Sequence, residues 1–307
     1  MESLVGYTGF VGSNLCKHGD FENVYNSKNI LDAYDTQPDL LVYAGVRAEK
    51  FLANQNKEAD FQQIKIAFNN IKKINPRKLV LISTVDVYKN PNNVDEHSEI
   101  ELENLHPYGY NRFLLEKMVR EEYPDSLIIR LPGLFGDNLK KNFIYDLIHV
   151  IPSMLSESKY KELCVISNLI SKNYEKSEGG FYKCKSLDQN EKKELKKEFL
   201  NCGFSSLNFT DSRGKFQFYN LAYLYDHIKI ALNNNIRIMN MATEPIDVSA
   251  IYHELYHEEF MNILDKPIPN YNFKTIYSEL YGGRDGYIFN KDQVMSDIMQ
   301  YIREQLK

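Results

Sequence analysis

A threonine, a tyrosine and an arginine carry the chemistry that this sequence suggests. Thr84 ends a strongly apolar run, and Tyr108 and Arg112 stand four residues apart in a segment with a helical pattern. Residues at i and i+4 share a helix face, so the guanidinium should lie beside the phenol. A fixed positive charge favours the phenolate, so we expect the pKa of Tyr108 to fall below its free value of about 10. Tyr108 would then serve as a general acid or base on an alcohol or carbonyl oxygen that Thr84 holds in place.

Three glycines at intervals of three residues stand near the start of the chain. Gly6, Gly9 and Gly12 follow the apolar pair Leu4-Val5, which is typical of the end of a buried strand, and a short helix is predicted over 13–18. Glycines between a strand and a helix let the backbone pass close to a pyrophosphate, which the helix N–H groups and dipole then stabilise. The alternative is a tight turn without a ligand, for which glycine is equally suited.

Short apolar runs alternate with helical segments through the first half of the chain. Such alternation implies right-handed crossovers and an α/β fold with a doubly wound parallel sheet, the Rossmann arrangement. Because ligands bind at the carboxyl ends of the strands in such a sheet, we expect the glycine segment, Thr84 and Tyr108 at one edge. The strands are predicted at 22–26, 38–45, 78–84 and 126–131, with helices at 56–74 and 108–122.

The second half has a looser pattern, which we interpret mainly as a smaller α/β substrate domain. Residues 1–140 are predicted to form the dinucleotide-binding domain, with later segments returning to its sheet, and residues 141–307 mainly the substrate-binding domain. The cleft between them is the default binding site. The charged run at 188–199 is interpreted as a solvated helix. Further strands are predicted at 216–221 and 236–242, and helices at 143–150, 222–232, 248–256 and 291–305.

Composition argues against several classes of protein. The 307 residues are 43% apolar and 26% charged, as in ordinary globular proteins. A net charge of −5 without a long basic cluster argues against nucleic-acid binding. No apolar run approaches the length that spans a membrane. Four cysteines lie far apart without metal-ligand spacing, so we expect reduced thiols, no metal site and a cytoplasmic location.

Five short segments occur in a characteristic order: GYTGFVG at 6–12, AG at 44–45, STVDVY at 83–88, YGYNR at 108–112 and RLPGLFG at 130–136. Together they resemble the extended short-chain dehydrogenase/reductase superfamily, in particular its NAD-dependent epimerase/dehydratase branch, which acts on nucleotide sugars. The resemblance implies that Tyr108 exchanges a hydroxyl proton, Thr84 assists it, and Arg112 binds the nicotinamide ribose. The family normally has lysine at the last position, and arginine cannot pass on a proton. A homodimer formed through the helices around Tyr108 is also implied.

The resemblance assigns the cofactor site to residues from several of these segments. In NAD enzymes an aspartate at the end of the second strand usually caps the adenosine ribose, whereas this chain has Asn26-Ser27-Lys28. A pocket without that carboxylate accepts a 2′-phosphate, with Ser27 and Lys28 as partners, so the sequence favours NADP over NAD. The other predicted cofactor-binding residues are Gly6, Gly9, Phe10, Val11, Gly12, Ala44, Gly45, Val46, Arg47, Tyr108, Arg112 and Pro132.

The residues after Thr84 limit the reaction. Dehydratases of this family carry Asp and then Glu directly after the threonine, and this chain has Val85 and Asp86, so dehydration is less favoured. Epimerisation and ketone reduction at a sugar carbon remain open, and a non-catalytic cofactor-binding paralogue, in which Arg112 marks lost catalysis, is the alternative. The predicted substrate-binding residues are Asp86, Asn142, Arg213 and Lys215, for which helix capping or plain solvent exposure is the alternative role.

Overall fold

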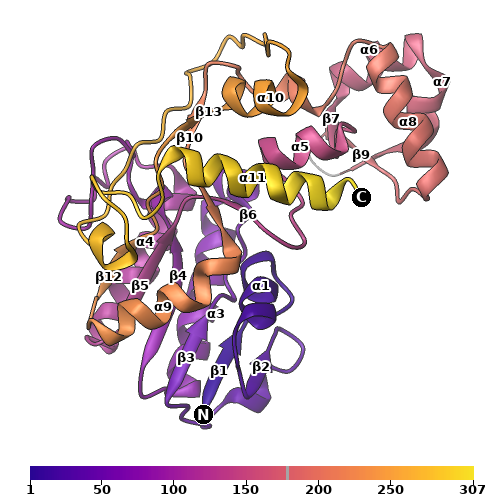
Figure 1. Ribbon diagram of the computed structural model, residues 1–307. Coiled ribbons are helices and arrows are strands. Elements are labelled where there is room, and N and C mark those ends of the chain that lie inside the picture. Colours follow the sequence, from indigo (N-terminus) through magenta and orange to yellow (C-terminus); the bar gives the residue numbers. More distant parts are fainter. Residues whose placement is uncertain (178–179) are drawn as a thin grey trace. The chain divides into compact units, whose positions relative to one another are not determined.

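The computed structural model describes residues 1–177 and 180–307, and the chain folds as two compact units (Figure 1). Unit 1 comprises residues 1–139, 215–246 and 270–298. Unit 2 comprises residues 140–214, 247–269 and 299–307. Segments from the second half of the chain therefore complete the unit that begins at residue 1.

Unit 1 is built on a six-stranded parallel sheet in the order β12-β5-β4-β3-β1-β2, which confirms the predicted doubly wound sheet. The strand order reverses at β1, because β2 lies on one side of it and β3 on the other. Ligands of open α/β sheets bind beside such a switch point, at the carboxyl ends of the strands. The strands are β1 Glu2–Val5, β2 Asn23–Tyr25, β3 Leu40–Tyr43, β4 Leu79–Thr84, β5 Leu127–Leu131 and β12 Ile238–Asn240.

Helices cover both faces of this sheet. Successive residues of a strand point to opposite faces, so each strand contributes apolar side chains to a core on either side. Leu4 packs in one cluster with Leu15 and Ile228, whereas Val5 packs in the other with Ile64 and Leu115. The first cluster lies under α1 and α9, and the second under α3 and α4 (Figure 1). The helices are α1 Phe10–His18, α2 Lys50–Gln55, α3 Lys57–Ile74, α4 Pro107–Glu122, α9 Leu224–Asn233 and α11 Lys291–Gln305, the last with its final residues in unit 2.

The short strands after β5 carry the chain away from the main sheet. β6 (Gly133–Phe135) pairs in parallel with β11 (Phe218–Asn220), close to β10 (Lys215–Phe216) in the sequence, and β13 spans Ile246–Asp247. The sequence predicted a single strand over 216–221, and the structure divides it into β10 and β11. Gln217 separates the two and is buried, with its amide donating to the carbonyls of Thr243 and Phe273.

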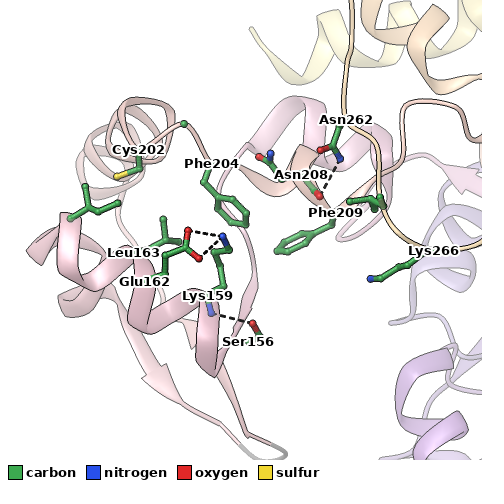
Figure 2. A pocket seen from close by; sticks show the side chains of 13 residues that line it. Ser156, Lys159, Glu162, Leu163, Cys202, Phe204, Asn208, Phe209, Asn262 and Lys266 are labelled. Atoms are coloured by element: carbon green, nitrogen blue, oxygen red, sulfur yellow. Dashed lines mark hydrogen bonds and ion pairs between the residues drawn. The ribbon is translucent and has the colours of Figure 1, made fainter.

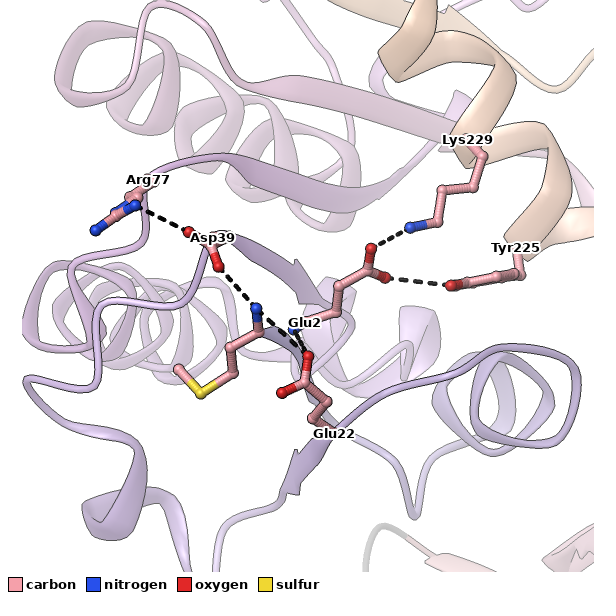
Figure 3. A network of polar contacts seen from close by, with 7 residues as sticks. Glu2, Glu22, Asp39, Arg77, Tyr225 and Lys229 are labelled. Atoms are coloured by element: carbon pink, nitrogen blue, oxygen red, sulfur yellow. Dashed lines mark hydrogen bonds and ion pairs between the residues drawn. The ribbon is translucent and has the colours of Figure 1, made fainter.

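Charged side chains join the strand starts at the amino-terminal edge of the sheet (Figure 3). The amino group of Met1 pairs with Asp39 at 2.7 Å and with Glu22 at 3.4 Å, so the starts of β1, β2 and β3 are held together. Glu2 accepts hydrogen bonds from Tyr225 and Lys229 of α9. These contacts lie at the amino-terminal edge of the sheet. Ligands are expected at the opposite edge, where the strands have their carboxyl ends.

Unit 2 has its own small core around a three-stranded antiparallel sheet in the order β7-β9-β8. The charged run predicted as a solvated helix is α8, and two of its apolar residues, Leu195 and Phe199, are nevertheless buried in this core. The sequence did not predict this sheet, α6 or α7. The elements are α5 Phe143–His149, β7 Met154–Ser156, α6 Glu157–Ile166, α7 Asn168–Asn173, β8 Tyr174–Lys176, β9 Phe181–Cys184, α8 Gln189–Asn201 and α10 Val248–Tyr256.

Candidate active site

The glycine segment forms a tight turn between β1 and α1, beside the switch point of the sheet. Gly6 has a φ of +97° and donates its N–H to the carbonyl of Tyr25 at 2.7 Å. A Cβ atom on Gly6 would lie 2.5 Å from the carbonyl oxygen of Ala44, and one on Gly12 would lie 2.0 Å from that of Gly6. Gly9 precedes α1, and no side chain caps the helix there. The turn therefore presents backbone N–H groups and the positive end of a helix dipole, which suits a pyrophosphate.

The residues after β2 form a small hydrogen-bonded turn next to Gly6. The side-chain oxygen of Asn26 accepts the N–H of Lys28 at 2.8 Å, and the N–H of Asn26 donates to the side chain of Asn29 at 2.8 Å. Ser27 and Lys28 are exposed. The first carboxylate after β2 is that of Asp32, so none stands at the strand end itself. The predicted partners of a 2′-phosphate are thus presented to solvent from an ordered turn.

Thr84 and Tyr108 meet at the carboxyl end of β4. Thr84 is the last residue of that strand, and its hydroxyl accepts the N–H of Asp86 at 3.1 Å. Tyr108 lies in the first turn of α4 and is only 7% exposed. His106 fixes this turn, because its Nδ1 accepts the N–H of Gly109 at 3.0 Å. A Cβ on Gly109 would lie 2.0 Å from the carbonyl oxygen of Asp86, so glycine permits this approach of α4 to the strand end.

The pKa of Tyr108 moves in the direction opposite to the one that the sequence predicted. Burial raises the pKa of the phenol, and the nearby Arg112, Lys50 and a hydrogen bond to Thr84 lower it by less, while Asp86 adds to the increase. The expectation of a lowered pKa was therefore wrong for the structure described here, because it considered charge without desolvation. Tyr108 holds its proton at neutral pH.

Arg112 is buried and held by protein partners, with its guanidinium carbon 4.3 Å from the centre of the Tyr108 ring. One terminal nitrogen donates to the carboxylate of Asp60 in α3, and the other donates to the backbone carbonyl of Arg47. The Arg47 side chain itself is exposed. These contacts tie α4 to α3 and to the loop after β3, and the predicted contact of Arg112 with the nicotinamide ribose stays a prediction.

A lysine that the sequence did not predict as part of the site also affects Tyr108. Lys50, the first residue of α2, pairs with Asp86 at 2.8 Å, and the Tyr271 hydroxyl donates to the same carboxylate oxygen at 3.3 Å. Burial lowers the pKa of Lys50, but Asp86, Tyr271 and Tyr108 raise it by more, so Lys50 stays protonated. No motif marked this lysine, since α2 is short and lies outside the five recognised segments.

A buried ion pair between Arg130 and Glu116 lies next to the end of β4. Arg130 of β5 donates to Glu116 of α4 at 2.7 Å and to the Tyr88 hydroxyl at 2.8 Å. Ser83, next to Thr84, donates its hydroxyl to Glu116 as well. Arg130 and Glu116 are both almost completely buried. These bonds lock α4 to β4 and β5, and thereby hold Tyr108 and Thr84 in register.

The residues predicted to bind substrate are placed by local contacts. Asn142 caps α5, since its side chain accepts the N–H of Tyr145 at 3.0 Å. Arg213 forms a two-bond pair with Asp211, at 2.9 and 2.7 Å. Asn142 and Arg213 belong to unit 2. Lys215, in β10, and Pro132, between β5 and β6, belong to unit 1. Their binding roles stay predictions.

Unit 2 contains a pocket of about 500 Å³ that the sequence did not predict (Figure 2). Phe204 and Phe209 meet edge to face across it, with ring centres 5.6 Å apart. Lys159 of α6 lies 4.9 Å from the centre of the Phe204 ring and pairs with Glu162. Neither Asn142 nor Arg213 lines this pocket.

No protein-family model matches this sequence, and no curated protein matches it. The structure does match solved ones. It matches dTDP-4-dehydrorhamnose reductase from Yersinia enterocolitica with a TM-score of 0.61 at 13% identity, covering 100% of this chain and 99% of that chain. For RMD from Pseudomonas aeruginosa, complexed with NADPH, the TM-score is 0.61 at 12% identity, with 99% and 98% covered. For WbmG from Bordetella bronchiseptica, complexed with NAD and UDP, the TM-score is 0.65 at 12% identity, with 99% and 94% covered.

The chain shares its fold with these solved proteins: a dTDP-4-dehydrorhamnose reductase, a protein complexed with NADPH and a protein complexed with NAD and UDP. The resemblance predicted from the five segments is thus confirmed at the level of the fold. Among the described residues no helix is both long and apolar enough to cross a membrane.

Proposed function

We propose that this protein is an NAD(P)-dependent enzyme that transfers hydride at a carbon of a nucleotide sugar, with Tyr108 as the general acid or base. The observation that carries the proposal is the meeting of Thr84 and Tyr108 at the carboxyl end of β4, in the unit that also holds the glycine turn before α1. Solved proteins with this fold contain NADPH, NAD or UDP, which adds support.

The residues of unit 1 suit a dinucleotide. The N–H groups around Gly9 at the start of α1 would hold the pyrophosphate. The turn at 26–28 would bind the adenosine ribose, with Lys28 facing a 2′-phosphate, and the segment 44–47 would line the nicotinamide half. The bound nicotinamide supplies or accepts the hydride.

The protonated state of Tyr108 favours ketone reduction. Reduction of a sugar ketone forms an alkoxide, to which Tyr108 would donate its proton while Thr84 hydrogen-bonds the same oxygen. A raised pKa keeps the proton available for this step. Epimerisation uses the same residues in both directions and remains the second candidate. Dehydration is less favoured because Val85, where dehydratases of the resembled family carry an acid, is buried and apolar.

Unit 2 is proposed to supply the contacts to the sugar and its nucleotide. Arg213 and Asn142 are the predicted contacts there, together with Lys215 and Asp86 of unit 1. Asn142 and Arg213 would have to use side-chain atoms beyond those that cap α5 and pair with Asp211. The homodimer and the cytoplasmic location stay predictions.

Tyr108→Phe tests the proposed function. It removes only the hydroxyl, so kcat should fall by about 10²- to 10⁴-fold while cofactor affinity changes little. Turnover is followed by nicotinamide absorbance with dTDP-, UDP- and GDP-linked sugars and their 4-keto forms. Net consumption of NADPH indicates a reductase, and interconversion without net consumption indicates an epimerase.

Tyr110→Phe is the matched control, because this second tyrosine of the same helix turn lies against the ammonium of Lys57 in α3. It should retain activity. If the wild type binds cofactor but turns over none of these sugars, the non-catalytic alternative is correct.

A further inference from the structure

The guanidinium of Arg112 is buried and held by partners within the protein. Its two terminal nitrogens donate to Asp60 and to the carbonyl of Arg47, and its side chain is only 6% exposed. Asp60 also accepts a hydrogen bond from the amide of Asn111. A guanidinium does not lose a proton at accessible pH. Arg112 can therefore place a fixed charge beside Tyr108, but it cannot renew the proton that Tyr108 gives away.

Little of Tyr108 faces solvent, since the residue is 7% exposed. Four groups affect the pKa of the Tyr108 phenol: Arg112 on α4, Asp86 after β4, Lys50 on α2 and Thr84 on β4. The centre of the His106 ring lies 6.3 Å from the centre of the Tyr108 ring. Of these only Lys50 combines an exchangeable proton that stays bound at neutral pH with substantial exposure, its side chain being 42% accessible.

The fold holds Lys50 in this place at two points. Asp86 binds its ammonium at 2.8 Å, and the backbone N–H of Asp86 donates to the Thr84 hydroxyl. One turn later in α2, the side chain of Asn54 accepts the N–H of Tyr108 at 3.0 Å, so α2 is attached directly to the start of α4. Through these contacts Lys50 and α2 are attached both to the strand end that carries Thr84 and to the helix start that carries Tyr108.

We propose that Lys50 relays protons between solvent and Tyr108, a role that Arg112 cannot fill. When Tyr108 has donated its proton to the substrate oxygen, an N–H bond of the Lys50 ammonium breaks and the phenol O–H bond re-forms. The neutral amine then takes a proton from water, while Asp86 keeps it in position. In the oxidation direction the proton travels the opposite way. No electrons change hands in this relay, and it completes the acid/base role proposed for Tyr108, on which it rests.

Proton exchange of the Tyr108 hydroxyl measures the relay without any turnover. Carbon NMR of labelled tyrosine detects hydrogen–deuterium exchange at the phenol, and Tyr108→Phe identifies the signal. Lys50→Arg keeps the charge and Lys50→Met removes it, and neither can relay a proton at neutral pH. Both should slow exchange about tenfold or more, whereas Lys57→Met, a lysine of α3 that contacts Tyr110, should not change it.

Steady-state kinetics provide a second test of the relay. Lys50→Arg and Lys50→Ala should both lower kcat by about tenfold or more, and small primary amines should restore the alanine variant in proportion to their concentration. Wild-type rates of hydroxyl exchange in Lys50→Arg, or full activity of Lys50→Arg, would overturn the relay. If the wild type turns over no nucleotide sugar, the proposed function fails on its own, and the exchange measurement still decides the role of Lys50.

Discussion

At the scale of single residues, burial outweighs charge at the candidate site. Arg112 lies against the Tyr108 ring, yet the pKa of Tyr108 is raised, since desolvation opposes the phenolate more than Arg112 favours it. Arg112, at the position where lysine is expected, pairs with Asp60, and Lys50 of α2 pairs with Asp86. Two positive charges from different helices therefore affect the Tyr108 phenol.

Cofactor choice is a second residue-scale property. Lys28 stands exposed in the turn after β2, where no carboxylate would repel a 2′-phosphate. Lys28→Ala should weaken NADPH binding by about 1–2 kcal/mol, or roughly 5- to 30-fold, because one charge-assisted contact is lost. NADH binding should change by less than about twofold.

Fluorescence titration of both cofactors with wild type and variant measures this difference. Lys17→Ala is a suitable control, since this lysine of α1 pairs with Asp137 instead of facing the turn. Equal loss for NADPH and NADH would remove Lys28 from the argument for NADP.

At the scale of elements, α1 and α4 reach the sheet only because glycines allow close contact. Gly12 lets α1 start directly against Gly6, and Gly109 lets α4 approach the backbone at Asp86. The glycine turn and the tyrosine helix are each brought to a strand end in this way. The structural requirement for Gly12 therefore holds whether or not a pyrophosphate binds.

Gly12→Ala should disrupt the turn. Its Cβ would lie 2.0 Å from the carbonyl oxygen of Gly6, a backbone atom, so β1 and α1 must move apart. We expect cofactor affinity to fall at least about tenfold and the free energy of unfolding to fall by about 1–3 kcal/mol, as for other overpacked sites.

Isothermal titration with NADPH and urea unfolding measure the two effects. Gly9→Ala serves as a comparison, because its Cβ would have 3.3 Å to the same oxygen and needs a much smaller shift. If Gly12→Ala binds cofactor as the wild type does, the turn does not hold the pyrophosphate.

At the scale of the whole molecule, each unit holds a buried group whose pKa is shifted strongly by burial. In unit 2, burial raises the pKa of Asp146 in α5 to about 7, partly opposed by Ser206. In unit 1, burial lowers the pKa of His227 to about 4. A raised carboxyl pKa means that the unfolded chain loses this proton first, so the contribution of Asp146 to stability is present at low pH and is lost as pH rises from about 4 to about 7. The buried histidine acts in the opposite sense.

Asp146→Asn isolates the first effect. The amide does not titrate, so the variant should gain stability over the wild type as pH rises from about 5 to about 8, by on the order of 2–4 kcal/mol at 1.4 kcal/mol per pKa unit. Thermal unfolding at several pH values measures the difference between the two proteins, in which the contribution of His227 cancels.

Hydrogen exchange of the backbone amides shows in which unit the change in stability occurs. Amides of α5 should become better protected in the variant at the higher pH, and those of α9, which carries His227, should not. A constant difference in stability across this pH range would contradict the raised pKa of Asp146.

The sequence alone determined the sheet and the order of its recognised segments. Apolar runs such as Leu79–Thr84, the glycine spacing at 6–12 and the Tyr108 segment are local patterns, and buried parallel strands and helix starts depend mainly on local patterns. The placement of Thr84 and Tyr108 at one strand end followed from topology, because all parallel strands end at the same edge.

Tertiary structure decided what no local pattern carries. The pairing of Arg112 with Asp60 joins residues 52 positions apart, and that of Lys50 with Asp86 joins residues 36 apart. The raised pKa of Tyr108 depends on burial by several elements, which spacing within one helix does not report. The strands of the small sheet in unit 2 are only three or four residues long, and apolar residues of α6, α7 and α8 complete its core. Such contacts between distant residues set the charge and the burial of the site.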